Sequence, residues 1–151
     1  MKKYFGAKEL GCIALIMLLA TMVQIWGSQK SLDIRLYYTA ADAKSFFAEL
    51  SPAETAAYIR HELFDLAFIG TYSLLFFFWL QRLFPQKKLF VALGFVPGLL
   101  DFIETTSILG VLLQGLQEPP LWLGTVTFLK WFGSICVLVL LIFGGLRRAK
   151  N

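Results

Sequence analysis

The sequence contains very few of the residues that bind metal ions or form disulfides. Among its 151 residues there are two cysteines and one histidine. Cys12 and Cys136 both lie in apolar runs without metal-ligating neighbours, so the sequence indicates neither a disulfide nor a thiolate metal site. His61 and Asp65 lie four residues apart in the segment HELFD, but the zinc-peptidase pattern requires a second histidine. No cofactor and no metal site are therefore expected, although a metal held by His61, Asp65 and the later acids remains an alternative.

The sequence also lacks the marks of a second domain and of the common catalytic motifs. It has no internal repeat, no low-complexity tract and no linker, which favours a single domain over residues 1–151. It has no nucleophile motif and no phosphate-binding loop, so no residue is assigned as catalytic. Whether the protein is an enzyme is left open.

Apolar and aromatic side chains are abundant. Hydrophobic residues make up 58% of the chain, and 15 of the residues are phenylalanine. The mean hydropathy is +0.68. An ordinary soluble domain averages about 45–50% apolar residues. The excess indicates an integral membrane protein, with the lipid bilayer as its expected partner.

Four apolar segments each approach the roughly 20 residues that a helix needs to cross a bilayer. They predict an all-α fold, a bundle of four transmembrane helices, with these spans: Leu10–Gly27, Leu63–Phe84, Leu89–Leu113 and Leu121–Gly145. No small-x-small cleavage pattern follows the first segment, which therefore reads as a retained helix and not as a signal peptide. Pro97 and Gly98 predict a kink in the third span.

Basic residues lie at one side of these spans. They are Lys2, Lys3 and Lys8 before the first span, Arg82, Lys87 and Lys88 between the second and third, and Arg147, Arg148 and Lys150 after the fourth. The positive-inside rule then places both termini in the cytoplasm. A nucleic-acid-binding protein would instead gather its basic residues on one folded surface, so no nucleic-acid partner is expected. The oligomeric state is not indicated.

The segment between the first two spans is predicted to form a helical cap on the outer side, at about residues 39–61. Thr39 followed by Asp42 is typical of a helix N-cap, and Ser51 followed by Glu54 is typical of a capping box. The second of these helices is expected to continue into the second span. The first is expected to run to Leu50, with an apolar face that covers the bundle mouth or lies along the membrane surface. That face consists of Phe46, Phe47 and Leu50.

Apart from Arg82 at the inner end of the second span, four charged residues fall inside the predicted spans, all in the outer half: Asp65, Asp101, Glu104 and Lys130. The inner stretches LGCIALIMLL, LLFFFWL, LFVALGFV and CVLVLLIFGG carry no charge. A charge at mid-bilayer costs about 2.5–3.5 kcal/mol on insertion scales, so these side chains should face the bundle interior and pair. Residues three, four or seven apart share a helix face, which aligns Asp65 with Tyr72. The same rule aligns Asp101, Glu104 and Thr105 on the third span, and Thr127, Lys130 and Ser134 on the fourth.

The expected partner of Lys130 is Glu104 or Asp101. Three carboxylates against one ammonium group leave an excess of negative charge. Either one acid is protonated, or a further cation joins: Arg35, Arg60, His61 or a ligand. The predicted outcome is a polar pocket that opens outward, with these candidate ligand-binding residues: Asp65, Asp101, Glu104, Lys130, Arg35 and Tyr72.

The segments LDIRLYYTAADAKSFFAEL, YIRHELFDLAFIGTYSLL, DFIETTSIL and FLKWF resemble a family of small four-span bacterial membrane proteins without an assigned activity. The family has a Leu-Asp-x-Arg segment after the first helix, an acid early in the second, Asp-x-x-Glu in the third and a Lys in the fourth. The resemblance covers about residues 32–132. It implies a bacterial cytoplasmic (inner) membrane location and a shared site at Asp33, Arg35, Asp65, Asp101, Glu104 and Lys130. The family commonly has Asn after the Glu, where this chain has Thr105.

These features favour a pocket that binds a small amphiphile or a lipid headgroup, in line with a looser architectural likeness to sterol-isomerase-like and sigma-2-receptor-like four-span proteins. Three alternatives stay open. The charges can form a purely structural ion-pair network that fixes helix register. A protonated carboxylate can serve a lipid-modifying enzyme as its general acid or base. The acids can also form a proton or cation site in an accessory or transport subunit.

Overall fold

The computed structural model describes residues 6–26, 31–32, 34–114 and 118–150. Over this part of the chain the structure is all-helical, without a strand. The helices are α1 (Ala7–Trp26), α2 (Ala40–Ala48), α3 (Pro52–Leu83), α4 (Lys88–Leu93), α5 (Val96–Gln114) and α6 (Leu123–Lys150). Lys2, Lys3 and Asp33 lie outside the described residues.

Three of these helical stretches are long and apolar enough to cross a membrane. They are Pro52–Leu83, Lys88–Gln114 and Leu123–Arg148, with mean hydropathies of 1.8, 1.5 and 2.3. They correspond to the second, third and fourth predicted spans. This indicates a multi-pass membrane protein. The segment predicted as the first span forms the 20-residue helix α1, which is not one of these three stretches.

The two predicted helix starts in the segment before α3 are confirmed. Thr39 caps α2, its hydroxyl accepting from the Asp42 N–H at 3.1 Å while the Asp42 carboxylate accepts from the Thr39 N–H at 2.8 Å. Ser51 and Glu54 form the same reciprocal pair at the start of α3. Helix α2 ends at Ala48, slightly before the predicted end. Helix α3 runs on without a break through the second predicted span.

The third predicted span is interrupted directly before Pro97. The break lies at Gly94 and Phe95, between α4 and α5, and Pro97 is inside the first turn of α5. A proline ring clashes with the carbonyl four residues before it, which forces the helix to end ahead of Pro97. In the first turn of the new helix the missing N–H costs no hydrogen bond. The interruption predicted from Pro97 is therefore present, in the turn before the proline.

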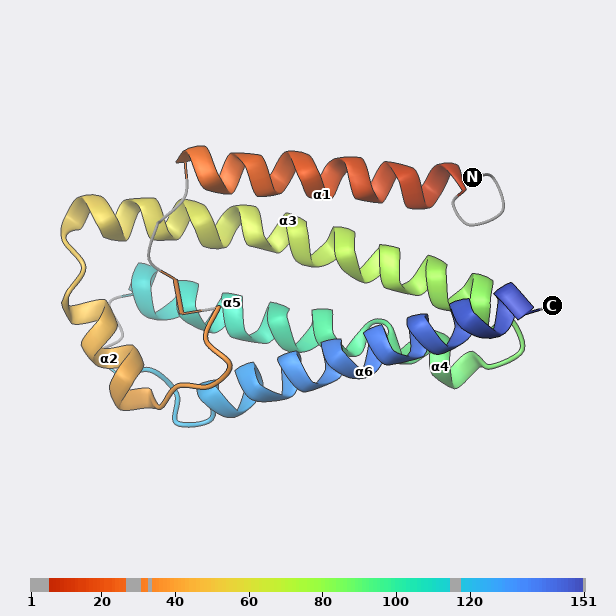
Figure 1. Cartoon of the computed structure of the whole chain (residues 1–151). Coiled ribbons are helices and arrows are strands. Elements are labelled where there is room, and N and C mark those ends of the chain that lie inside the picture. The colour runs from red at the N-terminus through yellow and green to blue at the C-terminus, as the bar shows by residue number, and fades with distance from the viewer. Residues whose placement is uncertain (1–5, 27–30, 33, 115–117, 151) are drawn as a thin grey trace.

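The helices are arranged around α3 (Figure 1). Helix α1 packs against α3 on one side, while α5 and α6 pack against it and against each other on the other side. Helix α1 runs antiparallel to α3, because Glu9 near its start pairs with Arg82 near the end of α3 at 3.4 Å. Glu9 is 5% exposed. The sequence reasoning overlooked this buried charge, since Glu9 precedes the apolar run.

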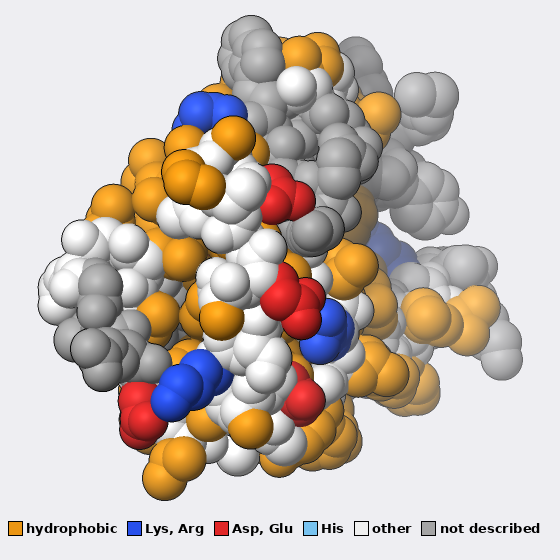
Figure 2. Space-filling model, turned by 90° about the vertical axis from the view of Figure 1, so that its left-hand side faces the viewer, with side chains coloured by type: hydrophobic (Ala, Val, Ile, Leu, Met, Phe, Trp, Pro, Cys, Tyr) orange, Lys and Arg blue, Asp and Glu red, His pale blue; other side chains and the backbone are white. Residues whose placement is uncertain are grey.

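Two separate apolar cores lie at opposite ends of the molecule. The core beneath α2 consists of Leu32, Tyr38, Ala43, Phe46, Tyr58, Ile108 and Leu123, with Phe47 and Leu50 packed against it. The other core joins Leu80, Phe84 and Val137. The apolar face of α2 therefore covers the end of the bundle. Figure 2 looks onto this end and shows acidic and basic side chains scattered among hydrophobic ones.

Gly124 is a point where the chain before α2 approaches α6 very closely. A Cβ at this position would overlap the backbone carbonyl of Tyr38. We expect Gly124→Ala to lower the free energy of unfolding by about 1–3 kcal/mol, the usual cost of overpacking. Gly110→Ala is the matched control, because a Cβ there meets nothing within 4 Å. Thermal unfolding in detergent measures both, and equal midpoints for the two variants would contradict the close approach.

The Asp42 carboxylate in the α2 cap provides a pH-dependent contact outside the spans. The N–H and the hydroxyl of Thr39 lower the pKa of Asp42 below its ordinary value of 3.8. Since this folded pKa is depressed, the cap contributes its full stability above pH 3.8 and loses it as the pH falls through the folded pKa. We expect Thr39→Val to raise the pKa of Asp42 in an NMR titration in micelles. An unchanged titration midpoint would show that the cap does not form.

Candidate functional site

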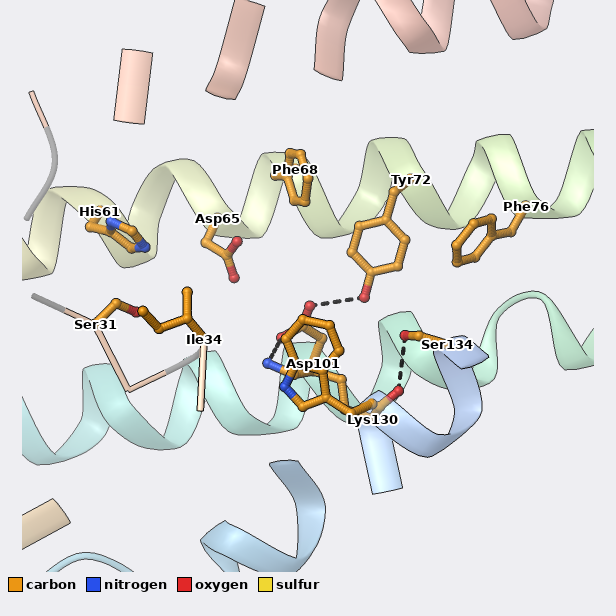
Figure 3. A pocket seen from close by; sticks show the side chains of 11 residues that line it. Ser31, Ile34, His61, Asp65, Phe68, Tyr72, Phe76, Asp101, Lys130 and Ser134 are labelled. Carbon is orange, nitrogen blue, oxygen red and sulfur yellow. Dashed lines mark hydrogen bonds and ion pairs between the residues drawn. The ribbon is translucent and has the colours of Figure 1, made fainter. Parts of the chain in front are cut away.

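A cavity of about 370 Å³ lies between α3, α5, α6 and the segment before α2. Its volume is at the small end of the range of about 300–1,000 Å³ for small-molecule sites. The cavity is lined by Ser31, Ile34, His61, Asp65, Phe68, Tyr72, Phe76, Asp101, Lys130, Trp131 and Ser134. Figure 3 shows the α3 side chains on one wall, facing the side chains of α5 and α6 on the other.

The α3 wall is a single helix face that changes from polar to aromatic along its length. His61, Asp65, Phe68, Tyr72 and Phe76 follow one another at steps of three or four residues, which places them on one side of the helix. His61 and Asp65 lie toward the α2 end of the molecule, and the aromatic rings follow (Figure 3). One wall thus offers both a polar and an apolar surface.

Lys130 joins the two acids of α5. Its Nζ donates to Asp101 Oδ1 at 2.9 Å and lies 2.6 Å from Glu104 Oε2. The exposed fractions are 6% for Lys130, 8% for Asp101 and 0% for Glu104. The predicted pairing is therefore present, and it involves both acids. We call these three residues the ion cluster.

Hydroxyl groups from other elements complete the ion cluster. Tyr72 donates to Asp101 Oδ2 at 2.9 Å. Glu104 Oε1 accepts from the Tyr38 hydroxyl at 2.9 Å and from the Thr127 hydroxyl at 2.6 Å. Buried charges are tolerated where such hydrogen bonds satisfy their remaining lone pairs. The cluster is thus held from α3, from α6 and from the chain before α2.

Asp65 is held in place next to the cluster. Its Oδ2 accepts a hydrogen bond from the Thr105 hydroxyl at 3.1 Å. The Thr105 hydroxyl thus supplies a donor from α5 to the acid of α3. Close packing of α3 on α5 makes this contact possible: a Cβ at Gly98 would overlap the Ser73 hydroxyl.

The structure separates the six predicted site residues into three groups. Asp65, Tyr72, Asp101 and Lys130 line the cavity. Glu104 lies behind the lining, fully buried, and pairs with the lining residue Lys130. Arg35 does not line the cavity: its guanidinium lies over the Phe46 ring at 5.9 Å, and its carbonyl accepts from Trp131 Nε1 at 3.1 Å.

Sequence reasoning missed Tyr38, Trp131 and Glu62. Tyr38 precedes α2 and contacts Glu104 across 66 positions, which no local pattern indicates. Trp131 follows the lysine, and a single tryptophan in an apolar segment is equally typical of a packing or interfacial residue. Glu62 is fully buried beside His61. The sequence does mark Glu62 as a candidate, because an acid at the start of an apolar span must find a polar or charged partner.

Among the described residues no group of three or more His, Cys, Asp or Glu side chains is placed to hold an ion.

Comparisons with family models, with curated proteins and with solved structures find no match.

Proposed function

We propose that the protein crosses the bacterial inner membrane four times, with both termini in the cytoplasm and α2 on the outer side. Helix α1 supplies the additional span. Its 20 residues correspond to about 30 Å at 1.5 Å per residue, the thickness of the hydrocarbon core. Leu10, Met17, Leu18 and Ile25 on α1 are 51–65% exposed, as expected for side chains in contact with lipid.

Cysteine accessibility tests this topology. In a chain without Cys12 and Cys136, we expect Lys44→Cys on α2 to react in intact cells with a thiol reagent that does not cross membranes. Lys87→Cys, between α3 and α4, should react only after the cells are opened, because it lies on the cytoplasmic side. The reverse pattern would contradict the proposed orientation.

The cavity is proposed to bind a small amphiphile or a lipid headgroup that is cationic or donates hydrogen bonds. The observation that supports this is the juxtaposition of carboxylates and aromatic rings in one cavity. Asp65 and Asp101 line it together with Phe68, Tyr72 and Trp131. Carboxylates attract an ammonium group, and aromatic faces add a cation–π contribution of about 0.5–2 kcal/mol. Two carboxylates pair with a single lysine, and a third carboxylate, that of Asp65, lines the same cavity, so added positive charge is favoured.

Each site residue has a distinct proposed role. The carboxylates of Asp65 and Asp101 accept hydrogen bonds from the ligand headgroup or pair with its positive charge. Lys130 is the counter-charge that keeps Asp101 in place. Glu104 is a positioning residue, because it does not line the cavity and pairs with Lys130, which does. The aromatic part of α3 contacts the apolar tail.

Binding of a fluorescent alkyltrimethylammonium probe to the protein in nanodiscs tests this function. We expect Asp65→Asn to weaken binding by at least about tenfold, because a hydrogen bond or contact to a charged group contributes about 1.5–3 kcal/mol. Asp42→Asn, which removes an exposed acid of α2, should leave the affinity unchanged. An alkyl sulfate with the same tail should bind weakly. Equal affinity for the two headgroups, or an unchanged affinity in Asp65→Asn, would contradict the proposal.

A further inference from the structure

A second cavity lies at the end of the molecule opposite α2. It has a volume of about 400 Å³ and lies between the C-terminal halves of α3 and α6. These two helix ends lie side by side near the C-terminus in Figure 1. The cavity is lined by Trp79, Arg82, Leu83, Leu138, Leu141, Ile142, Gly145 and Arg148. It shares no lining residue with the cavity at the ion cluster.

Most of this second cavity is apolar and open to the surface. Leu138 and Ile142 on its wall are 49% and 63% exposed. Gly145 leaves part of the space unfilled, because a Cβ there would meet nothing within 4 Å. In a membrane-spanning bundle such a surface faces lipid chains. The cavity therefore has the chemistry of a site for a hydrocarbon chain.

Two arginines give the same cavity a charged end. Arg82 pairs with Glu9 at 3.4 Å, so part of its charge is compensated. Arg148 Nη1 donates to the carbonyl of Arg82 at 3.5 Å, which keeps the two residues together. No described carboxylate lies within 4.0 Å of Arg148. The cavity end therefore carries excess positive charge next to an apolar groove.

We propose that this cavity binds an anionic phospholipid, with the headgroup phosphate at Arg82 and Arg148 and an acyl chain along the groove. Guanidinium groups match phosphate oxygens in geometry as well as charge. Basic pockets between transmembrane helices on the cytoplasmic side are typical sites for anionic headgroups. The apolar walls hold the chain, which a free phosphate ion would not need. This site is independent of the amphiphile site and rests on different residues.

The test measures which lipids stay bound. The full chain is placed in nanodiscs of equal phosphatidylglycerol and phosphatidylcholine and released for native mass spectrometry. We expect phosphatidylglycerol to be retained over phosphatidylcholine by about fivefold, since an arginine near an anionic surface contributes about 1 kcal/mol. Arg148→Gln should abolish this preference. The matched control is Arg147→Gln, an exposed neighbour that does not line the cavity, and it should keep the preference.

A second variant separates a lipid from free phosphate. Gly145→Leu fills the groove and leaves both arginines in place, so it should abolish lipid retention. Inorganic phosphate added at millimolar concentration should not displace the lipid. Retention in Gly145→Leu together with displacement by phosphate would show an anion site without a chain site and would overturn the proposal. Equal retention of phosphatidylglycerol and phosphatidylcholine by the wild-type protein would also overturn it. So would a preference for phosphatidylglycerol that survives Arg148→Gln.

Discussion

We expect Lys130→Met to lower the free energy of unfolding by about 3–5 kcal/mol, because the substitution leaves buried carboxylates without their counter-charge. Asp101 and Glu104 both lie within 2.9 Å of the lysine Nζ, and none of the three side chains is substantially exposed. Methionine has a similar length and fits the same space, so the loss is electrostatic and not a cavity. Reversible unfolding in mixed micelles measures it.

Lys44→Met is the control for removing a lysine from an ion pair. Lys44 pairs with Glu118 at 2.9 Å, but the two side chains are 56% and 78% exposed. Such surface pairs contribute about 0–1 kcal/mol. The Lys130 variant should therefore be much less stable than the Lys44 variant. Equal stabilities would mean that the ion cluster is hydrated or not formed.

A comparably large loss is expected for Tyr58→Ala, at about 3–5 kcal/mol, the range for deleting a large buried aromatic ring. Tyr58 is fully buried at the centre of the core beneath α2. Its ring lies 5.4 Å from that of Phe46, edge to face, and its hydroxyl accepts from the Leu32 N–H at 3.3 Å. The substitution removes the packing that holds α2 against α3. Protease cleavage around α2 should therefore become faster, while the membrane spans remain protected.

Tyr37→Ala is the matched control, since Tyr37 is 58% exposed and should lose little stability. Tyr58→Ala should also affect the ion cluster. Tyr38 belongs to the same apolar core and donates to Glu104, so loosening the core removes a hydrogen bond from the cluster. Unchanged protease sensitivity in Tyr58→Ala would show that α2 is held by other contacts.

Local rules account for the parts of the structure that the sequence predicted. The caps at Thr39 and Ser51 depend on residues three apart, so the pattern is visible in the chain itself. The long apolar helices follow from length and composition. The pairing of Lys130 follows from helical spacing together with the cost of an unpaired charge in lipid. The first two arguments need only one helix at a time, and the third adds only that an acid and a base lie at the same depth on different helices.

The features that the sequence did not predict depend on how separate segments approach one another. Tyr38 reaches Glu104 because Gly124 lets the chain pass close to α6, a contact that requires the complete fold. Arg35 was assigned to the pocket from its place near the outer mouth, but Phe46 and Trp131 hold it elsewhere. The cavity at Arg82 and Arg148 forms only because α3 and α6 end side by side.

The most direct test of the ion cluster is the coupling energy between Lys130 and Glu104 in a double-mutant cycle. The cycle compares Lys130→Met, Glu104→Gln and the double variant by their free energies of unfolding. Because the two groups are 2.6 Å apart and buried, we expect the double variant to be more stable than the sum of the single effects by at least about 1 kcal/mol. Effects that add within about 0.5 kcal/mol would show that the lysine and the acid do not meet.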